Sequence, residues 1–208
     1  MRTTLLLLLI LLCGMAVHAQ DADTTTLRKA KDYLQAKKCK DVNRVLAPML
    51  TETAPKPDAL LIRAKCRIYH EGKPQEGMAD LQRALDIEPD HFKVKLFRGD
   101  LYNDWDMFDR AESDLNDAVT LAPDSLGLIE ALNRRAWNSM DLRKFQSAKS
   151  DCERVLLMDS TNRAALNNLG LACNDLGDTA TTFRCLKAMV RLDPKDDVAW
   201  LNTGFFLG

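Results

Sequence analysis

The sequence contains little glycine and few aromatic residues, and neither sign of charge dominates it. Glycine occurs 9 times in 208 residues, and Phe, Trp and Tyr together make up 6% of the chain. Strands are rich in aromatic and β-branched residues, so this composition favours helices over sheets. Lys and Arg total 29 and Asp and Glu total 30. Because binding to a phosphate backbone requires a concentrated basic surface, nucleic acid is not expected as the main partner.

The residues that usually carry catalysis or bind cofactors are also scarce. Histidine occurs 3 times, and the sequence has no glycine-rich phosphate loop, serine-centred elbow or paired-cysteine motif. We therefore expect no enzyme activity, no cofactor and no metal. One alternative stays open, since Cys66 and His70 are four residues apart on one helix face. They are a candidate thiol nucleophile with its base, or two ligands of a metal ion.

Only one long apolar run is present, and it lies at the start of the chain. Residues 5–12 are unbroken apolar residues, preceded by a basic residue and followed by a small-residue site that ends at Ala19. This pattern predicts a secretory signal peptide over residues 1–19. The run is shorter than the roughly 20 residues that span a bilayer, so we expect an exported periplasmic or secreted protein without an integral membrane segment. An uncleaved signal anchor and a lipid anchor at Cys13 remain alternatives.

After removal of such a signal peptide, an odd number of cysteines remains. They are Cys39, Cys66, Cys152, Cys173 and Cys185. At most two internal disulfides can form, and at least one thiol is left over. A chain of this size does not need disulfides to fold, so we expect most of these cysteines to be small apolar core residues. One bridge between two of them remains open.

A period of 34 residues organises the chain. Pro55, Pro89 and Pro123 are spaced by 34, and Ser160 and Pro194 are again 34 apart. The predicted units are 24–57, 58–91, 92–125, 129–162 and 163–196, with a partial sixth at 197–208. Residues Leu126, Gly127 and Leu128 then form an insertion before the fourth unit.

Small residues recur at positions 8, 20 and 27 of the units. They are Gly99, Ala111 and Ala118 in the third unit and Ala136, Ala148 and Val155 in the fourth. Small side chains at these places allow two antiparallel amphipathic helices to cross closely. We expect leucine at Gly99 or Ala111 to overpack that crossing and to cost about 1–3 kcal/mol. The second unit departs from the pattern with Lys65 at position 8, and the first unit is degenerate.

The period, with its Leu-Gly, Ala and Pro pattern, resembles the tetratricopeptide repeat family over about residues 24–208. The resemblance implies an all-α fold, a right-handed α-α superhelix (solenoid) of about five helix pairs plus a partial sixth. It also implies a scaffold that binds a protein or peptide partner. In this family the first helix of each pair lines the concave groove, with positions 2, 5, 6, 9, 12 and 13 exposed.

Those positions contain aromatic residues suited to anchor a partner and asparagines suited to bind a peptide backbone. The candidate partner-binding residues are Arg63, Tyr69, Phe97, Asn133, Arg134, Trp137, Asn167, Asn168 and Asn202. Tyr69, Phe97 and Trp137, together with Met140, are predicted to form an apolar stripe along the groove. Asn168 and Asn202 both fall at position 6, which resembles the asparagine ladder in the repeats of O-linked N-acetylglucosamine transferases.

The leading hypothesis is therefore an exported scaffold that holds a peptide or protein partner in its groove. A second hypothesis rests on the last residues, where Phe205, Phe206 and Leu207 open a sixth unit without its second helix. Well-capped repeat arrays end in a polar helix, so this end is a candidate for self-association. Alternatively, the sequence is the N-terminal part of a larger envelope protein.

Overall fold

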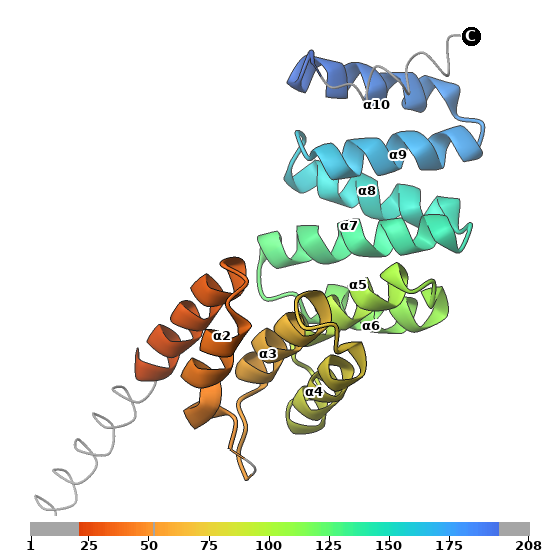
Figure 1. Ribbon diagram of the computed structural model, residues 1–208. Coiled ribbons are helices and arrows are strands. Elements are labelled where there is room, and N and C mark those ends of the chain that lie inside the picture. The colour runs from red at the N-terminus through yellow and green to blue at the C-terminus, as the bar shows by residue number, and fades with distance from the viewer. Residues whose placement is uncertain (1–20, 52, 196–208) are drawn as a thin grey trace, which may run out of the picture. The chain divides into compact units, whose positions relative to one another are not determined.

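The computed structural model describes residues 21–51 and 53–195 (Figure 1). The predicted signal peptide, the partial sixth unit and Asn202 lie outside these residues. Throughout the described residues the regular elements are helices, as the composition predicts. The chain divides into two compact units, one ending at Val94 and the other beginning at Lys95, and each is described by itself.

The first unit contains two helix pairs. Residues 21–35 and α2 (Cys39–Leu46) form the first pair, followed by the short 3-10 helix η1 (Ala47–Met49). The second pair is α3 (Pro57–Tyr69) and α4 (Pro74–Ile87). Both helices begin with proline, whose fixed φ suits the first turn and whose missing N–H has no partner there anyway.

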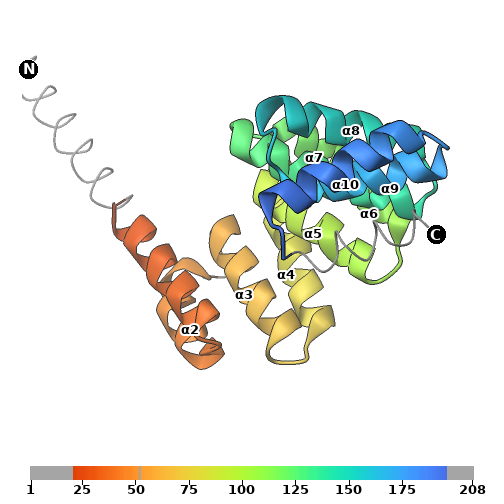
Figure 2. The same cartoon turned by 90° about the horizontal axis from the view of Figure 1, so that it is seen from above.

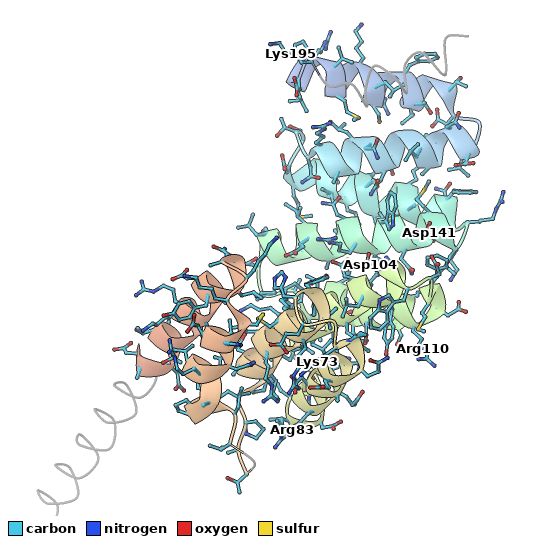
Figure 3. The ribbon with its side chains drawn as sticks, in the orientation of Figure 1. Lys73, Arg83, Asp104, Arg110, Asp141 and Lys195 are labelled. Atoms are coloured by element: carbon cyan, nitrogen blue, oxygen red, sulfur yellow. A yellow bond between two sulfur atoms is a disulfide. The ribbon has the colours of Figure 1, made fainter. Side chains whose placement is uncertain are left out.

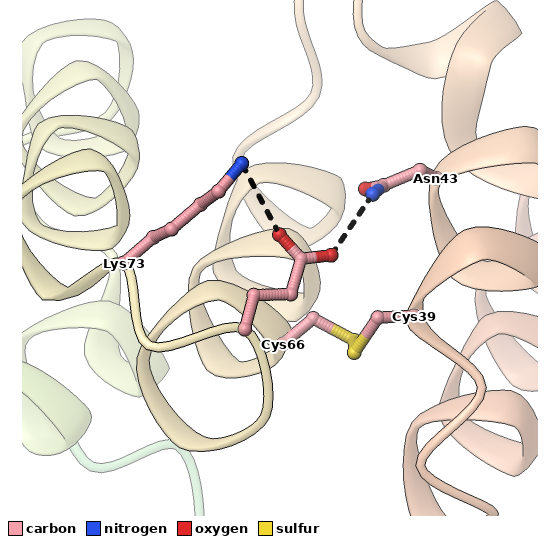
Figure 4. The surroundings of a disulfide bond; sticks show 5 residues. Cys39, Asn43, Cys66 and Lys73 are labelled. Atoms are coloured by element: carbon pink, nitrogen blue, oxygen red, sulfur yellow. Dashed lines mark hydrogen bonds and ion pairs between the residues drawn. A yellow bond between two sulfur atoms is a disulfide. The ribbon is translucent and has the colours of Figure 1, made fainter.

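A disulfide between Cys39 and Cys66 joins α2 to α3, with their Cα atoms 5.7 Å apart (Figure 4). Beside it, Asn43 Nδ2 donates to Glu71 Oε1 at 3.4 Å, and Lys73 Nζ lies 4.0 Å from Glu71 Oε2. The covalent link spans 27 residues of sequence and restricts the unfolded chain, which is the main way a disulfide stabilises a fold. The bridge left open by the sequence is therefore the Cys39–Cys66 pair.

The disulfide also overturns one alternative. A thiol nucleophile or metal ligand at Cys66 requires a free sulfur, and the Cys66 sulfur is bonded to that of Cys39. The hypothesis of thiol or metal chemistry at Cys66 and His70 was wrong, because spacing along one helix says nothing about a third side chain from a neighbouring helix. The remaining three cysteines of the described chain are buried, which confirms them as core residues.

The second unit begins within α5 (Phe92–Asp104) and continues through α6 (Phe108–Leu121), α7 (Ser125–Asp141), α8 (Phe145–Met158), α9 (Arg163–Asp175) and α10 (Thr179–Leu192). These helices form three pairs, which we call repeats three, four and five. Figure 1 shows α7 to α10 stacked in chain order, and Figure 2, which views the stack from above, shows α9 and α10 side by side. Buried side chains from α7 to α10, among them Leu132, Cys152, Leu166 and Met189, form one apolar cluster.

Side-chain caps and left-handed turn residues set the helix ends in this unit. Asp124 accepts from the Gly127 N–H at 2.8 Å and starts α7, while Asp178 accepts from the Thr181 N–H at 3.1 Å and starts α10. The turn inside repeat five places Gly177 at φ 76°, a conformation that glycine adopts without steric cost.

The small residues predicted at the helix crossings are buried in repeats three and four. Gly99 is packed tightly, because a Cβ there would lie 2.9 Å from both Cγ and Cδ2 of Leu115. Gly170 occupies the same position of repeat five, where a Cβ would meet only Cys185 Cβ at 3.5 Å. The two helices of a repeat therefore approach each other closely at Gly99, as the sequence pattern predicts, and less closely at Gly170.

In the second helix pair, the structure shifts the predicted repeat frame by one residue. Ala64 is fully buried and Lys65 is half-buried, so alanine and not lysine lies at the helix crossing. The reason is the turn between α3 and α4, which has four residues, 70–73, where the later pairs have three. The small residue that seemed to be missing at position 8 is present one place earlier.

The predicted insertion before the fourth unit is also resolved differently. Residues 126–128 do not form a separate linker but lie in the first turn of α7. That helix has 17 residues, against 13 in α9. Because a helical turn takes 3.6 residues, the extra residues lengthen the helix by about one turn and leave its packing face in phase.

Candidate functional site

A groove in the second unit is lined by the first helices of repeats three, four and five, and has a volume of about 500 Å³. Its lining residues are Asp100, Asn103, Asp104, Glu130, Asn133, Arg134, Trp137, Ala164, Asn167 and Asn168. All of them fall at positions that the family resemblance assigned to the concave face. The structure thus brings together five of the predicted partner-binding residues: Asn133, Arg134, Trp137, Asn167 and Asn168.

Acidic side chains outnumber basic ones in this groove. Arg134 Nη1 lies 3.0 Å from Asp100 Oδ2, so the cation of α7 is paired with a carboxylate of α5. Asp104 and Glu130 have no ion pair within the described residues. Three lining carboxylates against one guanidinium leave a net charge of −2 in the groove.

The asparagines of the groove bond to one another and leave acceptor groups unused. Asn133 Nδ2 donates to Asn162 Oδ1 at 3.2 Å, and Asn167 Nδ2 donates to Asn168 Oδ1 at 3.4 Å. The Oδ1 atoms of Asn103 and Asn133 are shielded from solvent and have no hydrogen-bond partner in the described part of the chain. An unpaired buried acceptor is costly in free energy. A rotation of either amide toward the open groove would let an N–H group of a bound chain donate to it.

Trp137 is the large exposed aromatic residue of the groove. It lies on α7 with 49% of its surface exposed and lines the groove between acidic and amide side chains. A rigid, partly exposed indole of this kind buries a large area on binding and loses little conformational entropy, which is why Trp is common at interface hot spots.

Other residues of the predicted set lie elsewhere. Phe97 is 8% exposed and does not line the groove, so the predicted apolar stripe is interrupted there. Arg63 donates from Nε and Nη2 to Asp80 at 2.9 and 2.6 Å, inside its own helix pair. Tyr69 is 53% exposed but belongs to the first unit. The one-residue shift of the repeat frame in α3 explains why Arg63 does not lie on the concave face. The shift moves this residue to the face that packs on α4.

Sequence reasoning selected aromatic and amide residues and passed over the acidic ones. Asp104 and Glu130 occupied concave positions in the sequence, but single acidic residues in a mixed-charge helix carry little signal. A usable signal was present at position 13 of repeats three, four and five, which is aspartate each time: Asp104, Asp141 and Asp175.

The free thiols of the second unit are not suited to chemistry. Burial raises the pKa of Cys152 to about 12 and the pKa of Cys185 to about 11. Burial also raises the pKa of Cys173. Because the thiolate is the reactive form, these residues stay protonated and inert near neutral pH. No group of three or more metal-ligating side chains gathers anywhere in the described part of the chain. Within the same residues, no helix has both the length and the apolar character needed to cross a membrane.

The groove lies on helices of the repeat type, and comparison with known proteins agrees. Residues 92–125 match the sequence model of the tetratricopeptide repeat family. This segment contains α5 and α6, and its bounds are those of the third predicted unit.

A human protein, RNA polymerase II-associated protein 3, is 32% identical over 112 residues. The matched region is 53% of this chain but only 16% of the human protein. The chain therefore corresponds to a small part of that relative.

Solved structures show the same fold at low sequence identity. PilF of Pseudomonas aeruginosa superposes with a TM-score of 0.76 and 14% identity, covering 88% of this chain and 82% of its own. A tetratricopeptide repeat protein of Parabacteroides merdae gives 0.71 and 18%, covering 88% of this chain and 71% of its own. The predicted all-α fold of stacked helix pairs is confirmed, while the handedness of the superhelix stays a prediction.

Proposed function

We propose that this chain is an exported, non-enzymatic scaffold that holds a peptide segment of a protein partner in the groove of α5, α7 and α9. The observation that carries the proposal is the groove itself, which is lined by Trp137 and by four polar residues predicted from the repeat register, Asn133, Arg134, Asn167 and Asn168. A groove with one aromatic anchor and several convergent polar groups is typical of a binding site.

The amides of the groove support an extended peptide as the occupant. Asn133 and Asn167 each present both donor and acceptor groups, and the Oδ1 atoms of Asn103 and Asn133 lack partners within the described residues. Amides placed along a groove hydrogen-bond a peptide backbone without reading its side chains. Trp137 then supplies the apolar contact, with a side chain of the partner packed on its indole ring.

Two features support export, and neither depends on the groove. Residues 5–12 have the apolar pattern of a signal peptide. The Cys39–Cys66 disulfide suits an oxidising compartment, because cytosolic thiols are kept reduced.

Photocrosslinking in the producing cell tests the proposal. A photoreactive benzophenone amino acid replaces Trp137, and the control carries it at Ser113, an exposed residue of α6 that does not line the groove. We expect a discrete protein adduct from position 137 and none from position 113. Equal trapping at both positions, or trapping of nothing but a second copy of the chain, would contradict a groove-bound partner.

A further inference from the structure

The first helices of the second unit share a feature that the proposed function does not use. Helices α5, α7 and α9 end at Asp104, Asp141 and Asp175, each at position 13 of its repeat. Figure 3 shows Asp104 and Asp141 at the ends of α5 and α7. All three residues are exposed. In the first unit, α3 ends with Tyr69 at the corresponding place.

A carboxylate is poorly suited to the last residue of a helix. The helix dipole places partial negative charge at that end, and it favours Lys, Arg or protonated His there. Within the described residues, no hydrogen bond or ion pair compensates Asp104, Asp141 or Asp175. Burial raises the pKa of Asp141, and the nearby charge of Asp106 raises it further. The carboxylate of Asp141 is therefore disfavoured in its charged form by its surroundings.

Aspartates at the ends of the second helices behave differently. Asp159 follows α8 and accepts from the Thr161 N–H at 3.1 Å, and Asp193 follows α10 and accepts from the Lys195 N–H at 3.0 Å. Hydrogen bonds from Thr161 and Asn162 lower the pKa of Asp159. These aspartates order the connections between repeats, which is a structural role that Asp104, Asp141 and Asp175 do not have.

One of the three unfavourable aspartates, Asp104, adds to the negative charge of the groove, and the other two occupy the same repeat position on α7 and α9. Asp104 itself lines the groove, together with Glu130, and Arg134 is already paired with Asp100. Cations are attracted to the face of an exposed indole as well as to carboxylates. A local rule that is broken at the same position of three successive repeats indicates that function and not stability selected the residues.

Resting on the proposed function, we propose that the occupant of the groove is a cationic segment, a stretch of a protein partner rich in Lys or Arg. The backbone of that segment lies along the asparagines, one basic side chain stacks on Trp137, and others pair with Glu130 and with the aspartates at position 13. The chain carries a net charge of −1, so this attraction is a local property of the groove and not of the whole protein.

The test uses an array of 12-residue peptides of random sequence, probed with the whole protein and with three variants. The first variant is the triple change Asp104→Asn, Asp141→Asn and Asp175→Asn, which removes charge and keeps shape. A second variant, Trp137→Ala, removes the anchor and keeps the charge. The third, Asp193→Asn, is the matched control, since it removes an aspartate that follows a helix without lining the groove.

We expect Lys and Arg to be enriched among the bound peptides, and raising the salt from 50 to 300 mM to weaken their binding. The triple variant should bind these peptides about tenfold more weakly, in keeping with three partly exposed charge pairs. Its melting temperature should equal or exceed that of the unchanged protein, because the charges opposed their helix dipoles. Asp193→Asn should bind as the unchanged protein does.

Two results would overturn the cationic segment: bound peptides without Lys or Arg enrichment, or undiminished binding by the triple variant. If binding is lost on Trp137→Ala in either case, the proposed binding function of the groove still stands. A fall in the melting temperature of the triple variant would overturn the argument from helix ends. If Trp137→Ala binds as well as the unchanged protein, the proposed groove function itself fails. An Asp→Glu triple variant that restores binding guards against a folding artefact.

Discussion

Repeats three and four differ from repeat five at two positions where the helices of each pair face one another. In repeat four, Arg135 donates from Nε and Nη2 to the two carboxylate oxygens of Asp151 at 2.8 and 2.7 Å. Repeat three has the same bidentate pair between Arg98 and Asp114. Repeat five has Leu169 and Cys185 at these positions, and both are buried. The two helices of a repeat are therefore joined at these positions by apolar contact in repeat five and by a hydrogen-bonded ion pair in repeats three and four.

The difference changes the surface as well as the interior. Arg135 also reaches α6, where Nη1 donates to Asn116 Oδ1 at 3.0 Å, and its long side chain covers the junction between repeats three and four. Where Leu169 replaces the arginine, the junction between repeats four and five has an open groove of about 510 Å³. It is lined mainly by apolar residues, among them Leu156, Leu157, Leu166 and Leu169. Leu157 is 88% exposed. The repeat frame thus accommodates either an ion pair or apolar residues at these two positions. The junction next to the apolar pair has an open groove, whereas Arg135 bridges the junction next to the ion pair.

The largest effect is expected when one partner of the ion pair in repeat four is removed. Arg135→Leu leaves the buried Asp151 with only the partly exposed Arg154, whose Nη1 lies 4.0 Å away, and we expect a loss of about 3 kcal/mol in the free energy of unfolding. Combining Arg135→Leu with Asp151→Cys copies the residues of repeat five and should recover most of that loss, since apolar replacement of a buried pair is often neutral. Urea unfolding of both single variants and the double variant measures the coupling. A double variant as unstable as Arg135→Leu alone would mean that the two repeats are not interchangeable here.

The two glycines at position 8 should respond to alanine with opposite signs. Gly99→Ala pushes a methyl group against the fully buried Leu115 and should lower stability by about 1–3 kcal/mol. Gly170→Ala finds ordinary contact distance to Cys185 and should raise stability by up to about 1 kcal/mol, because alanine is the better helix former. Thermal unfolding of the two variants compares them directly. A stabilising Gly99→Ala would refute the close crossing in repeat three.

Asn138 marks a further difference at one buried position. Leu101 in repeat three and Ala172 in repeat five are its counterparts, and Asn138 is 0% exposed with both side-chain polar atoms unpaired within the described residues. Asn138→Ala removes the desolvated amide at the cost of a small cavity, and we expect a gain of about 1 kcal/mol. Denaturant unfolding measures it, with Asn138→Asp, which buries a charge, as the destabilising counterpart. A clear loss on Asn138→Ala would indicate a partner for this amide.

The smallest expected effect is a pH dependence of stability that arises at Asp178, the residue that caps the start of α10. Lys149 Nζ donates to Asp178 at 2.9 Å and, together with the Thr181 N–H, lowers the pKa of Asp178 to about 2. A lowered folded-state pKa gives stability that is present above the unfolded pKa, near 4, and is lost as pH falls through the folded pKa. The advantage of the unchanged protein over Asp178→Asn should therefore be constant from pH 5 to 7 and vanish between about pH 4 and 2. Urea midpoints across this range measure it, and an advantage that persists below pH 2 would exclude titration of Asp178 as the cause.

The sequence by itself determined the repeat length, the helical class and most of the groove register. Periodicity carries this information because every unit places its small and apolar residues on the same helix faces. The repeat register therefore predicts Asn133, Trp137 and Asn167 at a groove and Gly99 and Ala111 at a helix crossing, and the structure has them there.

Tertiary structure alone decided the features that depend on one element meeting another. A turn longer by one residue moved Arg63 onto Asp80 and placed Ala64 at the helix crossing, although the spacing of the prolines was unchanged. The distance between α2 and α3 paired Cys39 with Cys66, and the packing of repeat three buried Phe97. Periodicity states which face a residue occupies, whereas the contacts on that face depend on turn lengths and on the side chains that the neighbouring helix presents.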